Sequence, residues 1–203
     1  MNFKKISIYT LLSASVLFTA CKKDDDEVVP AVENEQEIIT DVKLIFTNNA
    51  DSTDIVEAKA QDPDGTGVEE LKILDENTLD ASKTYNLTFQ IMNNLESPGE
   101  DIGEEIKEED NEHQFFFSFS ENAFTNPTGN GNIDSASDPI VYNDKDENGN
   151  SVGLSTSWTT SSTQLSKGTF TVKLQHQPDV KTVTSGSNDG DTDFELKFVL
   201  NIQ

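Results

Sequence analysis

The sequence lacks arginine, so all 14 of its basic residues are lysine, against 38 Asp and Glu in 203 residues. The formal net charge is −24 at pH 7. A nucleic-acid-binding protein needs a basic surface to displace counterions from phosphate groups, so this charge excludes that class. It also excludes electrostatic docking on anionic lipid headgroups. Without a guanidinium group, the protein cannot clamp a phosphate or carboxylate substrate in bidentate fashion.

Cysteine and catalytic motifs are also scarce. The single cysteine excludes an intrachain disulfide framework. The chain has no Gly-x-Ser-x-Gly elbow and no His-Glu-x-x-His motif, and nothing distinguishes two of its many carboxylates as a glycosidase pair. We therefore expect a protein that is not an enzyme. Hydrophobic residues make up 33% of the chain, which is enough for one modest core.

The first 20 residues have the pattern of a secretory signal peptide. Lys4 and Lys5 precede an apolar stretch at 6–18, which is the order of charge and hydrophobicity that such signals use. An apolar stretch of about 13 residues is too short to cross a hydrocarbon core of roughly 30 Å. The sequence therefore predicts a signal peptide at residues 1–20 rather than a permanent membrane span.

The residues around the end of this stretch resemble the bacterial lipobox. Leu17, Phe18, Thr19 and Ala20 lead directly into Cys21. The resemblance implies that Cys21 becomes the first mature residue and receives acyl chains, which would anchor the protein in a membrane. The alternative is an ordinary signal peptide in which the cysteine is incidental.

Residues 21–37 are predicted to form an acidic, disordered tether. The run Lys-Lys-Asp-Asp-Asp-Glu at 22–27 resembles the export signal that takes Bacteroidota lipoproteins to the outer face of the outer membrane. The segment has too little apolar surface to fold, and its like charges extend it, so a simple solvated spacer is the alternative. Together with the lipid anchor, the resemblance implies a location on the outer membrane with exposure at the cell surface.

From residue 38 to residue 203 the hydrophobic pattern has the period of two that strands show. Alternating segments lie at 42–47, 85–91, 115–119, 170–174 and 194–202, with weaker ones at 54–60, 71–74, 140–143 and 152–160. Clusters of Gly, Asn and Asp at 62–67, 126–131 and 187–190 are typical of turns. We therefore predict an all-β domain at 38–203, an antiparallel β-sandwich of the immunoglobulin-like kind with about seven to nine strands.

One segment, near residues 97–112, departs from the strand pattern and is predicted to be an acidic loop or a short helix. Ile102 and Ile106 lie four residues apart, as on one face of a helix. Eight of the thirteen residues at 100–112 are Asp or Glu. Long loops of compact domains are often functional, so this segment is a candidate for a binding site.

The two histidines of the chain both lie at the end of a predicted strand. His113 comes four residues after Glu109 and eight after Glu105, so a continuing helix would carry all three on one face. His176 ends a later strand, and the two strand ends could meet beside Glu112. Imidazole and carboxylate groups are ligands of Zn²⁺ and Cu²⁺, so we predict that these five residues bind one of these ions. The alternative is a solvated acidic loop with two surface histidines.

A second candidate site lies in the turn that contains Asp144, Asp146 and Asn148. These residues match the opening Asp-x-Asp-x-Asn-Gly of a calcium-binding loop. Ser155 stands where such a loop carries a bidentate Glu, and the flanking segments have strand patterns where helices would be expected. Calcium therefore ranks behind zinc and copper, with a plain β-turn as the alternative.

Three features together resemble a family of small flavobacterial lipoproteins: the acidic stretch running into His-Gln-Phe-Phe-Phe at 113–117, His-Gln-Pro-Asp at 176–179, and an Asp-rich final hairpin. Such proteins tend to be encoded near TonB-dependent outer-membrane receptors. The resemblance implies a lipid-anchored binding module, at the cell surface or facing the periplasm, that captures a divalent metal ion or metal complex for a receptor. Two other functions stay open, namely a structural or adhesion-type surface lipoprotein without a small ligand and, more remotely, a secreted hydrolase.

Overall fold

The computed structural model of the chain describes residues 37–62, 64, 65 and 70–203. The predicted signal peptide at 1–20, the predicted lipidation site Cys21 and all of the predicted tether except Glu37 lie outside the described residues. The described residues all belong to one compact unit.

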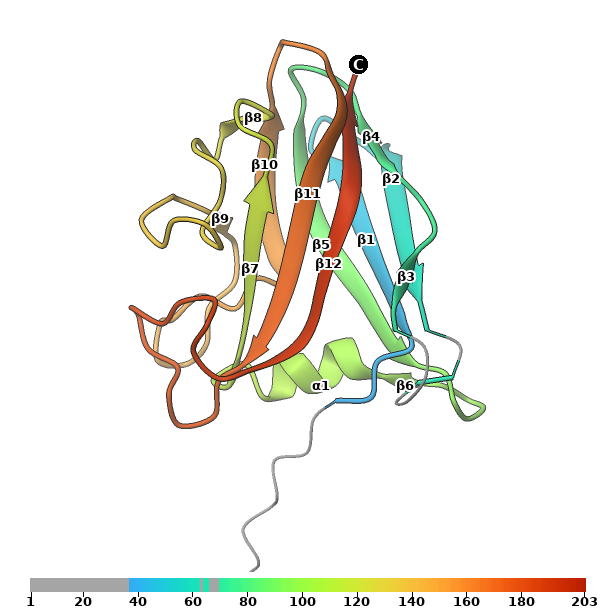
Figure 1. Ribbon diagram of the computed structural model, residues 1–203, viewed down its shortest axis with the longest axis vertical. Coiled ribbons are helices and arrows are strands. Elements are labelled where there is room, and N and C mark those ends of the chain that lie inside the picture. Colours follow the sequence, from blue (N-terminus) through green and yellow to red (C-terminus); the bar gives the residue numbers. More distant parts are fainter. Residues whose placement is uncertain (1–36, 63, 66–69) are drawn as a thin grey trace, which may run out of the picture. The chain divides into compact units, whose positions relative to one another are not determined.

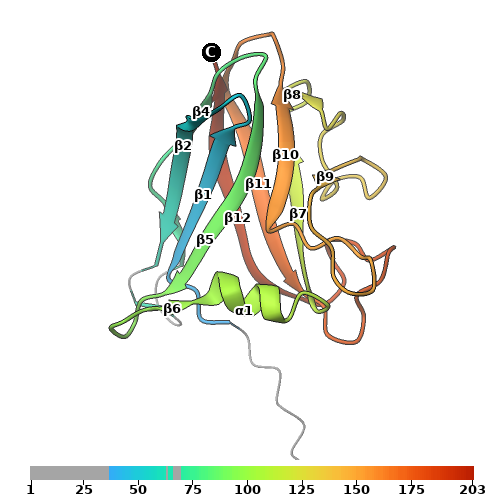
Figure 2. The same cartoon turned by 180° about the vertical axis from the view of Figure 1, so that it is seen from behind.

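The fold is all-β, as predicted, and two sheets face each other with a single hydrophobic core between them (Figures 1 and 2). Along the larger sheet the strands follow the order β3 (Lys72–Ile73), β2 (Asp51–Gln61), β1 (Asp41–Asn48), β5 (Thr84–Asn93), β10 (Ser155–Thr160) and β8 (Phe124–Asn126), with β6 (Glu100–Asp101) beside β5 and β9 (Val141–Tyr142) beside β10. Every neighbouring pair in this sheet is antiparallel.

The smaller sheet has four strands in the order β4 (Asn77–Leu79), β12 (Asp191–Ile202), β11 (Leu165–His176) and β7 (His113–Phe119). Its pairs are antiparallel except for the parallel pair of β4 and β12. The described residues thus form 12 strands, more than the expected seven to nine. The additional strands are β4, β6 and β8, which have only two or three residues each and are too short to show alternation.

The alternation of each strand determines which side chains enter the core. In β1, Val42, Leu44 and Phe46 are buried while the residues between them are half-exposed. Trp158 of β10 is fully buried at the centre. The phenyl rings around it have centroids 4.9 to 5.5 Å from the indole and belong to Phe117, Phe119, Phe124 and Phe170. Such aromatic contacts add to the stabilisation that burial provides.

The acidic segment contains the helix α1 (Ile102–Glu108), which agrees with the short helix among the two alternatives. The Asp101 side chain caps it by accepting a hydrogen bond from the backbone N–H of Glu104 at 3.3 Å. Ile102 and Ile106 are buried in the core. Figures 1 and 2 show α1 lying across one end of the two sheets, where β7 begins and β11 finishes. We call this end the helix end of the sandwich.

Candidate metal site

The structure brings the two histidines together at the helix end. His113 begins β7, His176 ends β11, and the antiparallel register pairs them directly. Each continues the inward-facing row of its strand, which includes Phe115 and Phe117 in β7 and Leu174 in β11. His113 is therefore fully buried and His176 is only 4% exposed. The alternative of two surface histidines is excluded.

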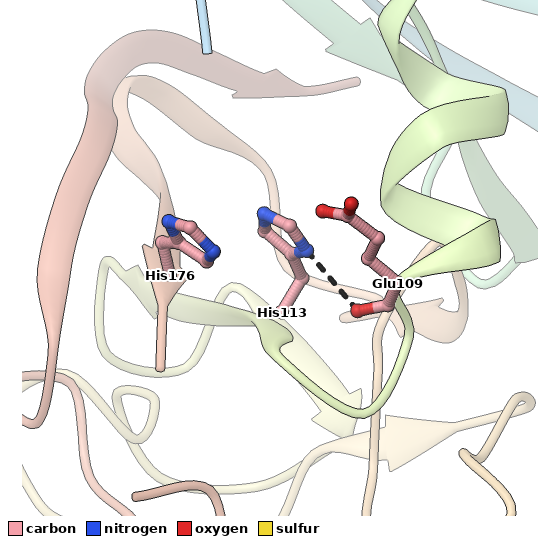
Figure 3. Close-up of side chains that lie close together, drawn as sticks. All are labelled: Glu109, His113 and His176. Atoms are coloured by element: carbon pink, nitrogen blue, oxygen red, sulfur yellow. Dashed lines mark hydrogen bonds between the residues drawn. The ribbon is translucent and has the colours of Figure 1, made fainter. Parts of the chain in front are cut away.

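The two imidazole rings are stacked face to face (Figure 3), with centroids 4.5 Å apart and planes 2° from parallel. The lone pair of an imidazole nitrogen lies in the plane of the ring, so the lone pairs of two parallel rings do not converge on one point. In this arrangement one ring at a time can direct a nitrogen at an ion. Binding by both histidines requires one ring to turn about its side-chain torsions.

The backbone carbonyl of Glu109, directly after α1, determines which ring nitrogen of His113 carries the proton. Its Nδ1 lies 3.2 Å from the carbonyl oxygen of Glu109 (Figure 3). A carbonyl oxygen only accepts, so Nδ1–H donates, and Nε2 keeps a lone pair. A backbone carbonyl behind the ring is a common support for a metal-binding histidine. Burial lowers the pKa of His113 to about 4, so the ring is neutral at pH 7, as a metal ligand must be.

Two of the predicted carboxylates lie at the histidines. One carboxylate oxygen of Glu109 and one nitrogen of each histidine lie within 4.8 Å of one another. Oε2 of Glu112 lies 3.6 Å from Nε2 of His176. Both acids belong to the turn between α1 and β7, because Glu109 caps the helix and Glu112 directly precedes the strand. Four of the five predicted ligands therefore meet at the helix end.

Glu105, the fifth predicted ligand, lies apart from the group formed by the two histidines and Glu109. The helix ends one residue before Glu109, so the single helical face expected for Glu105, Glu109 and His113 does not form. Glu105 instead joins a cluster of carboxylates with Glu100 and Glu37. Burial, followed by the interactions with Glu100 and Glu37, raises the pKa of Glu105 to about 7. The pKa of Glu37 is also raised, by burial and then by the charge of Glu109.

A further acid, Asp193 of β12, lies beside the histidines and was not predicted from the sequence. In the pairing of β11 with β12, Leu174 faces Phe194 whereas Gln175 faces Thr192. Asp193 is therefore the extra residue of a β-bulge, a feature that often redirects a side chain beside a functional site. Sequence alternation gives no signal for such a displacement.

Four buried side-chain atoms of the candidate site have no hydrogen-bond partner among the described residues. They are Nε2 of His113, Nε2 of His176 and both carboxylate oxygens of Asp193. Oδ2 of Asp193 lies 4.0 Å from Nε2 of His113, too far for a hydrogen bond. Burial, with a smaller contribution from the charge of Glu37, raises the pKa of Asp193 to about 7. Buried polar atoms are normally paired, so these unpaired atoms are candidates for binding a cation.

In the second candidate site, the turn at 144–148, the carboxylates already have partners within the protein. Asp144 accepts hydrogen bonds from two backbone N–H groups further along the chain, at 2.9 and 3.2 Å. Asp146 accepts from the backbone N–H of Asn148 at 2.9 Å and forms a buried ion pair with Nζ of Lys181 at 3.2 Å. The lysine ammonium thus supplies the positive charge that the sequence pattern assigned to calcium. The geometry favours the structural turn, and we propose no calcium site here.

Comparison of the chain with protein-family models, with curated proteins and with solved structures finds no match. Within the described part of the chain, no helix is long and apolar enough to span a bilayer. The resemblance to flavobacterial lipoproteins therefore gains no support from these comparisons.

Proposed function

We propose that this protein is a lipid-anchored binding module that captures a divalent transition-metal ion, Zn²⁺ or Cu²⁺, at the helix end of its sandwich. The observation that supports this most directly is the buried pair of His113 and His176 beside the carboxylate of Glu109. Their Nε2 atoms have no hydrogen-bond partner in the part of the chain that the structure describes. A buried polar atom without a partner costs about 1 to 3 kcal/mol of folding free energy. A cation would offset that cost for several atoms at once.

The ligand atoms favour an ion of intermediate softness. Neutral imidazole nitrogen and carboxylate oxygen together suit Zn²⁺ and Cu²⁺. Ca²⁺ prefers six to eight oxygen ligands, which a site built around His113 and His176 does not offer. The residues that supply the ligand atoms carry no sulfur, so Cu⁺ is not favoured.

The location and the partner belong to the same proposal but rest on the sequence alone. Acylation of Cys21 would hold the protein on the outer membrane, and the acidic run at 22–27 would direct it to the cell surface. A TonB-dependent receptor is then the partner to which the captured ion would pass. In this proposal the protein binds and delivers, and it catalyses no reaction.

Calorimetric titration with Zn²⁺ tests the metal site. The parent protein should carry Cys21→Ser, because an unacylated thiol would itself bind zinc. We expect one ion per chain, and we expect His113→Ala and His176→Ala each to weaken binding at least tenfold, or about 1.4 kcal/mol. Glu104→Gln is the matched control, since this acid of α1 is exposed and pairs with Lys107 on the helix surface.

A titration with Ca²⁺ at low and high salt separates the proposed site from a simple acidic surface. Such a surface would bind Ca²⁺ and Zn²⁺ about equally, would lose affinity strongly with added salt and would not respond to either histidine substitution. That pattern would reject the metal site, and the structural or adhesion-type alternative would then be preferred.

A further inference from the structure

We infer that Asp193 is a ligand of the captured ion, paired with His113, and that the bulge in β12 delivers it to the site. This inference rests on the proposed function, because it adds a ligand to the proposed metal site. Strand β12 would then contribute a ligand, although none of the ligands predicted from the sequence lies in this strand.

The bulge reverses the direction in which the Asp193 side chain would otherwise point. Phe194 and Leu196 face the core, so a regular strand would direct Asp193 outward together with Glu195, whose side chain is 51% exposed. The side chain of Asp193 is instead fully buried. The local geometry of β12 thus places a carboxylate where a regular strand would place none.

When Asp193 is ionised, its carboxylate and Nε2 of His113 face each other as two acceptors. Nδ1–H of His113 is directed at the carbonyl of Glu109, so Nε2 presents a lone pair toward Oδ2 of Asp193 across 4.0 Å. Two acceptors at this distance repel, and neither carboxylate oxygen has another partner among the described residues. A cation between them would convert the repulsion into two bonds.

The distance between Oδ2 of Asp193 and Nε2 of His113 is also close to that between two ligand atoms of one metal ion. Two ligand atoms bonded to one tetrahedral ion at about 2.0 to 2.1 Å are roughly 3.3 Å apart. Oδ2 of Asp193 and Nε2 of His113 must therefore approach by less than 1 Å to share an ion, starting from 4.0 Å.

Glu112 and His176 form a second pair of the same kind, with Oε2 and Nε2 3.6 Å apart. A turn of one imidazole out of the stack would let both pairs bind the same ion. The resulting set of two nitrogens and two oxygens suits Zn²⁺ better than Ca²⁺.

Zinc titration of Asp193→Asn in the Cys21→Ser parent tests this inference. We expect affinity to fall at least roughly tenfold, because loss of a direct ligand should cost no less than loss of a residue that only orients a ligand, which costs about 10- to 100-fold. The matched control is Glu195→Gln, which makes the same change of charge on the outer face of the same strand and should bind zinc like the parent. Asp193→Glu keeps a carboxylate and should bind more tightly than Asp193→Asn.

Thermal unfolding in the presence and absence of Zn²⁺ separates a ligand from a structural residue. At pH 7.5 and without metal, Asp193→Asn should melt no lower than the parent, because it removes a buried, unpaired carboxylate that is ionised at this pH. The rise in melting temperature on adding Zn²⁺ should be smaller for Asp193→Asn than for the parent. A variant that melts lower without metal and gains as much from Zn²⁺ as the parent does would show a purely structural role and overturn the inference.

The outcomes also distinguish this inference from the proposed function. If the parent binds no zinc, the metal site is wrong, and the role of Asp193 is rejected with it. If the parent binds zinc and His113→Ala weakens binding while Asp193→Asn does not, only the inference fails. Equal zinc affinity for Asp193→Glu and Asp193→Asn would also count against the carboxylate as a ligand.

Discussion

Removing Asp193 should change how the stability of the metal-free protein depends on pH, and removing His113 should change it in the opposite sense. Burial lowers the pKa of His113 from 6.5 to about 4 and raises the pKa of Asp193 from 3.8 to about 7. In the unfolded chain both groups return to their ordinary values. The free energy of unfolding rises with pH where the unfolded state binds more protons, and it falls with pH where the folded state binds more.

In the unsubstituted protein the two effects cancel between about pH 4 and pH 6.5. Over this range the unfolded chain carries a proton on His113 and none on Asp193, whereas the folded protein carries one on Asp193 and none on His113. Each state therefore holds one proton on the pair. The pair contributes no slope to the pH dependence of stability in this window.

Each single substitution removes the compensation. In Asp193→Asn, His113 still binds a proton near pH 6.5 in the unfolded chain but only near pH 4 in the folded protein. The variant should therefore lose about 3 kcal/mol relative to the parent as pH falls through this window. In His113→Gln, the raised pKa of Asp193 means that the folded state binds the extra proton. Relative to the parent, in which His113 offsets this effect, the variant should therefore lose about 3 kcal/mol as pH rises from about 4 to 6.5.

Unfolding by guanidinium chloride at several pH values between about 4.5 and 7.5, with a chelator present, measures these differences. Other titrating groups such as Glu105 are common to the parent and the variants, so they largely cancel when the curves are subtracted. We expect difference curves of opposite slope for Asp193→Asn and His113→Gln. Two difference curves that do not change with pH would refute the assignment of a neutral, buried pair.

Three further predictions concern other parts of the chain. Cys21→Ser should move the protein from the detergent-extracted membrane fraction to the soluble or unprocessed fraction, and retention in the membrane at the parent's level would contradict the lipid anchor. Removal of residues 21–36 should leave the melting temperature unchanged, because this segment has little apolar surface to bury. Gly190→Ala should destabilise the protein by about 1 to 3 kcal/mol and weaken zinc binding, because its Cβ would lie 2.0 Å from the carbonyl oxygen of His176 at a φ of +83°. Gly149→Ala is the control and should cost less, because it has a similar φ of +85° and no atom of the described residues lies within 4 Å of the new Cβ.

The main strands could be predicted because each has one face on the core. Alternation marks strands such as β1 and β12 without any knowledge of their neighbours. The short strand β4 could not be found in this way, because its parallel pairing with β12 depends on contacts between distant parts of the chain. The end of α1 was also beyond the pattern, which allowed the helix to continue to His113.

The candidate site was predictable only where it follows strand periodicity. His113 and His176 extend the inward rows of their strands, so their position at strand ends could be predicted. That β7 and β11 are neighbours, which brings the two rings together, could not. Asp193 interrupts the alternation of β12, and the position of a bulge depends on how β12 pairs with β11. The stacking of the two rings likewise depends on the register between β7 and β11, which a single sequence does not reveal.

The pairing of His113 with His176 also has a consequence for the time at which an ion can bind. The two residues are roughly 60 positions apart in the chain, so their strands meet in a non-local step of the kind that slows folding. Asp193 joins them only after β12 has paired with β11. If the protein is exported as proposed, the unfolded chain would have no preformed site and would carry no ion across the membrane. The folded domain would then acquire the ion after export, and the bound ion would stabilise its folded state.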